Sequence, residues 1–232
     1  MTATTLTRLS CVLFDLDGTL IDSAPGITAC LAETIREFGG PSVRPESLRA
    51  FVGPPVADTL RMFTALPEAA LPRAIESYRA RYWAEGLLQS SVFPGVVALL
   101  AMLREWGIPA AVATSKRESH ARAILELHSL DAYFGVVSGA GEDEAAAGKN
   151  AVIQSALGRL GESPSSSLMV GDRSFDIRGA IVVGLPSMFA EWGYGTPDEA
   201  EGAAYLARDP HHASDLLHHH LVGSASRTQG AS

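Results

Sequence analysis

"VLFDLDGTLIDSA" (residues 12–24) joins a short apolar run to two acids that stand two residues apart. The apolar residues 12–14 predict a buried strand, and Gly18 after the second acid predicts a turn. A turn explains the glycine but leaves the pairing of Asp15 with Asp17 unexplained. Neighbouring carboxylates repel each other unless a cation or a proton separates them, so the reason for this pair has to lie elsewhere in the chain.

The length and charge of the chain limit its class. It has 232 residues, of which 47% are hydrophobic and 19% charged, and its formal net charge is -8. This length allows a full core in one large domain or two small ones. The negative charge argues against a nucleic-acid partner, which requires a basic face. It is compatible with a divalent cation and a small anionic substrate.

Cysteine usage and hydropathy indicate the compartment. Two cysteines, Cys11 and Cys30, form neither a disulfide framework nor a CxxC pair, which favours a reducing compartment. Residues 1–10 lack the apolar core of a signal peptide. The longest apolar run, residues 96–103, is too short to span a bilayer. We therefore expect a cytoplasmic protein without a membrane partner, as a monomer or a homodimer.

Short apolar segments alternate with amphipathic ones through most of the chain. The predicted strands are residues 11–15, 108–115, 134–139, 167–172, 185–190 and a weaker sixth at 203–207. The predicted helices are residues 95–106, 118–128, 149–160 and 174–183. This alternation predicts an α/β fold, a Rossmann-like parallel sheet with helices on both faces. Ligands of such folds bind at the carboxyl ends of the strands.

Residues 23–92 break the alternation. Pro and Gly divide them into helical segments at 26–40, 45–53, 55–66 and 67–86, and none of these segments has a convincing strand pattern. The sequence predicts a helical domain at 23–92 inserted after the first strand, with a core of residues 1–22 and 93–222 and a return hinge at 89–95. Residues 223–232 are small and polar and are predicted to be disordered.

Four polar groups lie at the end of a predicted strand or open a predicted helix, at residues 15–19, 114–116, 149 and 171–176. In a parallel sheet all four are expected at the same edge. Asp15, Asp17 and Asp172 offer the hard oxygen ligands that Mg2+ takes. Thr114 and Lys149 offer a hydroxyl and an ammonium, which suit a phosphate oxygen. Together the groups predict a site for Mg2+ and a phosphoryl group.

Simpler interpretations exist for each group alone. Two acids before a glycine often form a solvated turn, and the segment 172–176 could be a helix N-cap followed by an acid. Asp176 lies one helical turn after Asp172, so it could also support the metal site. Lys116 and Lys149 are the only lysines among 18 basic residues, and both lie in these groups. Lys116 could reach the phosphate or could equally be a solvated lysine.

The motifs "DLDGTLIDS", "ATSK", Lys149 and "VGDRSFDIRGA" resemble those of the haloacid dehalogenase superfamily, over residues 10–218. The resemblance is to its phosphatase branch, in which a helical cap follows the first motif. "FVGPP" (51–55) and "WGYGT" (192–196) are further similar to phosphoglycolate phosphatase-like and 5'-nucleotidase-like members.

The resemblance implies roles for the acids. Asp15 would attack phosphorus and form an aspartyl-phosphate, and Asp17 would be the general acid and then the general base. The backbone carbonyl of Asp17 would join Asp15 and Asp172 as a ligand of Mg2+. Asp176 would orient metal-bound water or Lys149.

The resemblance also implies how the substrate is held. Thr114 and Lys149 would neutralise charge on the phosphoryl oxygens, and the backbone of Ser115 could add a donor. Substrate choice would lie in the cap, where Arg49 and Gly53 could face the active site, although a surface salt bridge explains Arg49 equally well. The expected partner is a small phosphorylated metabolite, with phosphoglycolate first and a nucleoside 5'-monophosphate second.

Single residues of the sequence argue against two other activities of the superfamily. Asp17 argues against a dehalogenase, which has no leaving alkoxide to protonate, and residues 19–92 lack the cap lysine of phosphonoacetaldehyde hydrolase. Two alternatives stay open. One is a phosphotransferase or sugar phosphomutase of the same superfamily, and the other is a non-catalytic binding module on this fold.

Overall fold

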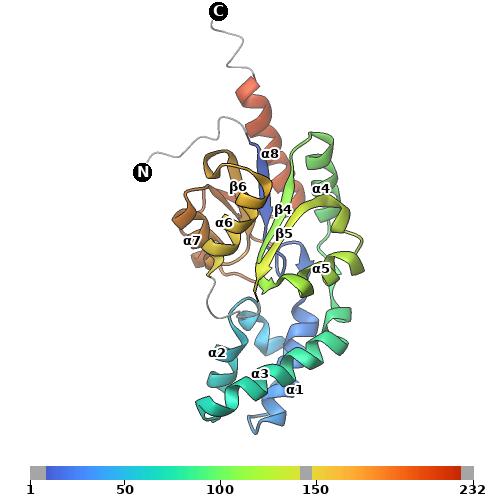
Figure 1. Ribbon diagram of the computed structural model, residues 1–232, viewed down its shortest axis with the longest axis vertical. Helices are drawn as coiled ribbons and strands as arrows, with labels where there is room; N and C mark the ends of the chain where they lie inside the picture. Colours follow the sequence, from blue (N-terminus) through green and yellow to red (C-terminus); the bar gives the residue numbers. More distant parts are fainter. Residues whose placement is uncertain (1–8, 142–147, 226–232) are drawn as a thin grey trace, which may run out of the picture. The chain divides into compact units, whose positions relative to one another are not determined.

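Six parallel strands form the sheet of the larger unit of the molecule (Figure 1). The computed structural model describes residues 9–141 and 148–225. The strand order is β5-β4-β1-β6-β7-β8. The strands are β1 (Cys11–Phe14), β4 (Ala110–Arg117), β5 (Phe134–Ala140), β6 (Ser167–Gly171), β7 (Ser187–Ala190) and β8 (Tyr205–Ala207). The predicted Rossmann-like parallel sheet is confirmed, and no end of its six strands differs from the prediction by more than two residues.

Strand β1 lies in the middle of the sheet. Val12 pairs with Ala110 of β4 on one side and with Leu168 of β6 on the other. All four residues of β1 are fully buried, which explains why they form a continuous apolar run without alternation. The chain proceeds from β1 to β4 and β5 on one side and then crosses to β6, β7 and β8 on the other. The carboxyl end of β1 therefore lies at the switch point where such sheets bind ligands.

Helices cover both faces of this sheet (Figure 1). They are α4 (Val96–Glu105), α5 (Glu118–Leu127), α6 (Lys149–Leu160), α7 (Ser174–Val183) and α8 (Pro210–Ala225). Val152 and Ile153 of α6 and Ala180 of α7 share one buried cluster with Leu13 of β1. Helices α4 and α8 contact each other over the opposite face.

The end of α8 corrects one prediction. The helix continues to Ala225, so residues 223–225 are helical and not disordered. An established helix extends at little cost, even through small polar residues, and composition alone misses this. Residues 226–232 lie outside the described part of the chain.

The chain divides into two compact units, with boundaries after Leu20 and after Ser91. The smaller unit is helical, and its elements are α1 (Ala24–Glu37), η1 (Pro45–Phe51), α2 (Val56–Phe63), η2 (Glu68–Ala70), α3 (Leu71–Arg81), η3 (Tyr82–Gly86) and η4 (Leu87–Gln89). The second predicted segment is a 3-10 helix. It begins at Pro45 and is followed by "GPP" (53–55), which leaves too few residues for a stable α-helix.

A two-stranded sheet formed by β2 (Ile21–Asp22) and β3 (Ser91–Val92) lies at the two boundaries. Strand β3 lies within the predicted return hinge at 89–95, outside the four predicted helical segments, and neither short strand is predicted by the sequence. A strand of two residues is too short to leave an alternating pattern in the sequence, so periodicity cannot reveal it.

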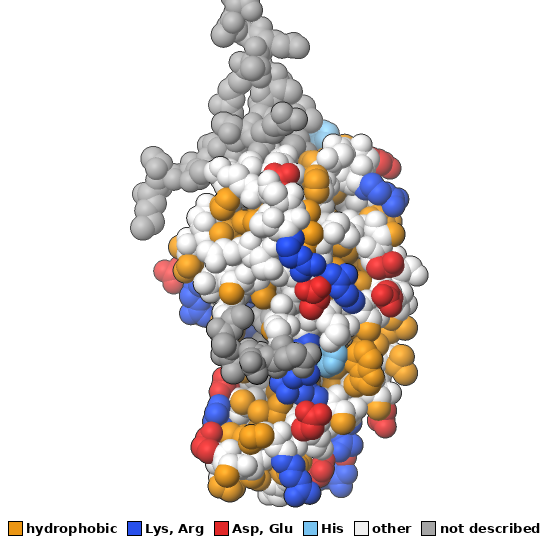
Figure 2. Space-filling model, in the orientation of Figure 1, with side chains coloured by type: hydrophobic (Ala, Val, Ile, Leu, Met, Phe, Trp, Pro, Cys, Tyr) orange, Lys and Arg blue, Asp and Glu red, His pale blue; other side chains and the backbone are white. Residues whose placement is uncertain are grey.

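Neither the charge on the drawn face nor the hydropathy of the described helices indicates a nucleic-acid-binding face or a membrane span. Acidic and basic side chains are interspersed over the face drawn in Figure 2 and do not separate by sign. Within residues 9–141 and 148–225, no helix is both long and apolar enough to cross a membrane.

Close backbone contact in the smaller unit gives a test of the fold. A Cβ atom at Gly26 of α1 would lie 1.9 Å from the carbonyl oxygen of Gly86. We expect Gly26→Ala to lower the free energy of unfolding by about 1–3 kcal/mol, because backbone has to move. At Gly158 of α6 an added Cβ meets nothing within 4 Å. Gly158→Ala should therefore raise the free energy of unfolding by up to about 1 kcal/mol, because alanine favours the helix. Urea denaturation measures both, and equal effects would contradict the packing described.

Candidate active site

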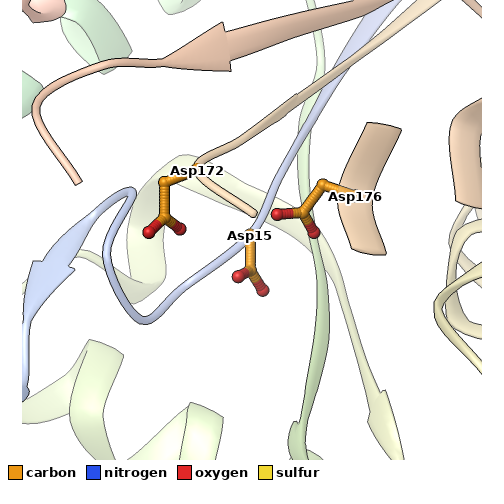
Figure 3. Close-up of side chains that lie close together, drawn as sticks. All are labelled: Asp15, Asp172 and Asp176. Carbon is orange, nitrogen blue, oxygen red and sulfur yellow. The ribbon is translucent and has the colours of Figure 1, made fainter. Parts of the chain in front are cut away.

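Two strands and one helix bring three carboxylates together at the carboxyl edge of the sheet (Figure 3). Asp15 directly follows β1, and Asp172 directly follows β6. Asp176 lies in the first turn of α7. The backbone N–H of Asp15 donates to the carbonyl of Val170 at 2.9 Å, which keeps the ends of β1 and β6 aligned. The sheet register therefore fixes where the first two acids emerge.

The three carboxylates share a buried space. One oxygen of each lies within 4.8 Å of the others. Burial, together with the charges of Asp176 and Asp15, raises the pKa of Asp172 well above its usual range. Burial and the charge of Asp15 likewise raise the pKa of Asp176 to about 6, although the Lys149 ammonium opposes the shift. The ionised cluster therefore requires compensating positive charge.

Lys149, the first residue of α6, supplies part of that charge. Its Nζ lies 2.6 Å from Oδ1 of Asp15 and 2.6 Å from Oδ1 of Asp176. Burial would lower the pKa of this ammonium, but the two acids more than reverse the effect, so its pKa is raised. Lys149 is therefore a cation at neutral pH, and it links the carboxyl end of β1 to the start of α7.

The segment "WGYGT" (192–196) encloses Asp172 from another side. The backbone N–H of Tyr194 donates to Oδ2 of Asp172 at 2.8 Å, and the hydroxyl of Thr19 donates to Oδ1 at 3.2 Å. A Cβ at Gly193 would lie 2.2 Å from the Cβ of Asp172, and one at Gly195 would lie 1.9 Å from its carbonyl oxygen. Only glycine allows this approach, which explains the G-x-G spacing of the segment.

Sequence reasoning did not assign these contacts to Asp172. The G-x-G spacing was the available signal, because two glycines near a strand end often mark a close backbone approach. The indole N–H of Trp192 also donates to the carbonyl of Thr19 at 2.9 Å, which ties the segment to the turn of the first motif.

The end of β4 places Thr114 and Lys116. The β4–β5 register shifts between Ala113 and Arg117, so β4 carries extra residues there. Thr114 is buried, and its Oγ1 accepts the backbone N–H of Lys116 at 3.2 Å. The intervening Ser115 is exposed.

Lys116 turns back onto the second acid of the first motif. Its Nζ lies 2.8 Å from Oδ2 and 3.1 Å from Oδ1 of Asp17. The exposed fractions of the two side chains are 10% and 13%. The interpretation of Lys116 as a solvated lysine is therefore wrong, and its ammonium lies on a carboxylate.

The remaining predicted residues lie elsewhere in the chain. Arg49 belongs to η1, and Gly53 follows it with a φ of 106°, both in the smaller unit. Their proposed contact with substrate stays a prediction. The acidic stretch Glu142-Asp143-Glu144, which precedes Lys149 in the sequence, lies outside the described residues. His218, the first of three consecutive histidines near the C-terminus, stacks obliquely on Trp106, with ring centroids 5.3 Å apart.

The donor set fits a hard divalent cation. Mg2+ takes oxygen ligands and binds proteins through one or two carboxylates. Asp15 and Asp172 offer such oxygens, with Asp176 beside them. Burial, together with repulsion from neighbouring acids, raises the pKa values of Asp172 and Asp176, and a bound cation would offset both effects.

Comparison with known proteins identifies the family. The family described as "Haloacid dehalogenase-like hydrolase" matches residues 12–190, so the chain belongs to the haloacid dehalogenase-like hydrolases. The fold has solved counterparts. A predicted phosphatase from Clostridium acetobutylicum superposes with a TM-score of 0.85 at 33% identity, over 90% of this chain and 98% of that one.

Individual relatives have different names. "Tyrosine-protein kinase PtkA" of Mycobacterium tuberculosis is 42% identical over 81% of this chain, and the match spans only 64% of that protein. A 5'-nucleotidase of Pseudomonas aeruginosa is 32% identical over 88% of this chain and 91% of that protein. A phosphoglycolate phosphatase of Aquifex aeolicus is 30% identical over 79% and 85%.

The carboxylate cluster predicts a linked response to pH and metal. The pKa of Asp172 in the folded protein lies well above the ordinary value of 3.8 for an aspartate, so the stability linked to its proton is complete below that ordinary value. It is lost as pH rises through the raised pKa. In EDTA near pH 7 we therefore expect Asp172→Asn to melt at a higher temperature than the unaltered protein. Mg2+ should raise the melting temperature of the unaltered protein and raise that of the variant much less.

Differential scanning calorimetry at several pH values measures both effects. An equal rise with Mg2+ in the two proteins would contradict a cation site at Asp172.

Proposed function

We propose that this chain is a Mg2+-dependent phosphatase that hydrolyses a small phosphate monoester through an aspartyl-phosphate. Its class, a phosphoric monoester hydrolase, is supported by the family and by several relatives and solved neighbours. The observation that carries the proposal is the position of Asp15. This carboxylate is held at a strand end by Lys149, and Asp17 follows two residues later.

In the first step an oxygen of Asp15 forms a bond to phosphorus as the bond from phosphorus to the ester oxygen breaks. The electron pair of the broken bond goes to the leaving oxygen, which takes a proton from Asp17. The products are the free alcohol and a phosphoryl group carried on Asp15. A carboxylate is a suitable nucleophile here because it is anionic at neutral pH without a separate base.

In the second step water attacks the same phosphorus. Asp17, now a carboxylate, takes a proton from that water as the new bond forms. The bond between phosphorus and the oxygen of Asp15 breaks, and its electron pair restores the Asp15 carboxylate. Inorganic phosphate leaves, and both acids return to their starting states.

Other residues of the sheet edge would stabilise the charge on the transferred group. Lys149 would face a phosphoryl oxygen while still contacting Asp15, and Thr114 and the backbone of Ser115 would add donors. Asp176 would keep Lys149 oriented, as their 2.6 Å contact supports. This arrangement places positive charge where negative charge develops in the transition state.

A metal ion would complete the charge balance. Asp15, Asp172 and the backbone carbonyl of Asp17 would hold Mg2+, with Asp176 supporting the site. Bound Mg2+ would supply positive charge beside the attacking carboxylate and the transferred oxygens. Because Asp15 and Asp172 belong to one buried cluster, they could bind the ion without a large rearrangement.

Substrate choice would rest with residues 23–92 acting as a cap that excludes bulk water. Arg49 and Gly53 are the proposed contacts there. We propose phosphoglycolate as the first candidate substrate and a nucleoside 5'-monophosphate as the second. Relatives that carry both names support this choice, at 30% and 32% identity.

Phosphate release tests the hydrolase directly. The purified protein should release inorganic phosphate from members of a panel of phosphoglycolate, nucleoside 5'-monophosphates and sugar phosphates when Mg2+ is present, and not in EDTA. Asp15→Asn should lower the rate by roughly 10³-fold or more, because it removes the nucleophile. Asp131→Asn, an exposed change in η5 (Asp131–Tyr133), is the matched control and should leave the rate unchanged. A folded Asp15→Asn variant with undiminished activity would overturn the assignment.

Transfer to an acceptor is the second candidate function. The 42% identity to a protein named tyrosine-protein kinase supports it, as does the chemistry of an aspartyl-phosphate, which can pass its phosphoryl group to a hydroxyl.

Radiolabelled ATP separates the two functions. The phosphatase proposal predicts free phosphate from monoesters without an acceptor and no label on a tyrosine-containing acceptor protein. Label on that acceptor, with little phosphate released from any monoester, would favour the transferase. A folded protein that does neither would favour the non-catalytic binding module.

A further inference from the structure

The only two lysines of the chain each contact an acid of the first motif. The sequence has 18 basic residues, and all except Lys116 and Lys149 are arginine. Lys149 contacts Asp15, and Lys116 contacts both carboxylate oxygens of Asp17. A lysine ammonium is a compact charge, whereas the guanidinium of arginine is a wide planar fork. The choice of lysine at these two places therefore points to a geometric requirement beside each acid.

The backbone is shaped to deliver Lys116. Lys116 lies in the irregular stretch of β4 between Ala113 and Arg117, where the register with β5 shifts. Gly139 of β5 permits this path, because a Cβ there would lie 2.6 Å from the carbonyl oxygen of Lys116 and 2.5 Å from the backbone nitrogen of Glu118. Such irregularities redirect side chains and are frequent beside active sites.

The pair between Lys116 and Asp17 is largely withdrawn from water. The two side chains are 10% and 13% exposed, and Nζ lies 2.8 Å and 3.1 Å from the two oxygens of the carboxylate. Withdrawing two charges from water carries a desolvation penalty that offsets much of their attraction, so such a pair is weak evidence for a role in stability. A pair with this geometry is better explained by the orientation it gives to the acid.

We infer that Lys116 is a positioning residue that fixes the carboxylate of Asp17, and that it acts on the reaction through Asp17 rather than by binding the phosphoryl group. The inference rests on the proposed function, in which Asp17 gives a proton to the leaving oxygen. A carboxylate must lie within hydrogen-bond reach of that oxygen to do so. Lys116 belongs to β4, the strand next to β1, and its Nζ contacts both carboxylate oxygens of Asp17. These contacts limit how far the Asp17 side chain can rotate.

The effect of losing Lys116 should depend on the leaving group of the substrate. A poor leaving group, such as an unsubstituted phenol, needs the proton of Asp17 as the ester bond breaks. A dinitrophenol leaves as a stable anion and needs little help. Loss of Lys116 should therefore slow poor leaving groups more than good ones, whereas loss of a phosphate contact should slow all of them alike.

A series of aryl phosphates, from phenyl phosphate to 2,4-dinitrophenyl phosphate, measures this dependence. The quantity compared is kcat/KM, since it reports the steps up to release of the leaving group. We expect Lys116→Met to lower kcat/KM for phenyl phosphate by about 10- to 100-fold and for the dinitrophenyl ester by less than about 3-fold. Inhibition by inorganic phosphate, read as its competitive inhibition constant, should stay within about 2-fold, because the phosphoryl contacts are intact.

Three further variants act as controls. Lys116→Arg keeps the charge and should lose less than Lys116→Met on phenyl phosphate. In an Asp17→Asn background, Lys116→Met should change kcat/KM for phenyl phosphate by less than about 2-fold, since its partner is already gone. Arg122→Met removes a cation from nearby α5 that contacts Glu118, and it should leave the series unchanged.

The outcomes distinguish a failure of the proposed function from a failure of the role assigned to Lys116. If the unaltered protein hydrolyses no member of the series, the proposed function fails and the role of Lys116 fails with it. If the unaltered protein is active but Lys116→Met slows every ester equally, or weakens inhibition by phosphate, the role of Lys116 alone is overturned. A full effect of Lys116→Met in the Asp17→Asn background would also overturn it.

Discussion

Crowding of negative charge at one edge of the sheet is the constraint on which the rest of the site depends. Asp15, Asp172 and Asp176 bring carboxylate oxygens within 4.8 Å of one another in a buried space. Repulsion between buried carboxylates would destabilise the fold or force one of them to bind a proton, unless positive charge lies close to them. Lys149 contacts two of the acids, and hydrogen bonds from Thr19 and Tyr194 reach the third.

The fold provides the rigidity that this crowding requires. Strand β1 is buried on both faces and paired on both sides, so the residue after it has little freedom to retreat from its neighbours. The glycines at 193 and 195 let backbone approach Asp172 more closely than any side chain would allow. The site is thus preorganised by the sheet and by close backbone contacts, as electrostatic catalysis requires.

Much of this arrangement follows from the sequence, and the exceptions have physical reasons. The apolar run before Asp15 and the alternation of strands and helices predict the sheet and the edge at which the acids gather, because burial imposes those patterns. The contact of Lys116 with Asp17 was not predictable, since it depends on a register shift in β4 that periodicity does not encode. The hydrogen bonds to Asp172 from Thr19 and Tyr194 depend on tertiary approach, which local pattern indicates only through glycine spacing.

Direct detection of the covalent intermediate tests the central claim, that Asp15 is the nucleophile among these charges. The protein is mixed with a substrate and Mg2+, quenched in acid within one turnover, and digested for mass spectrometry. The account predicts a phosphoryl group on the peptide that contains Asp15, at the position of that residue, appearing and decaying at rates consistent with turnover. Phosphate release without any such adduct, or an adduct on another residue that forms as fast as turnover, would contradict it.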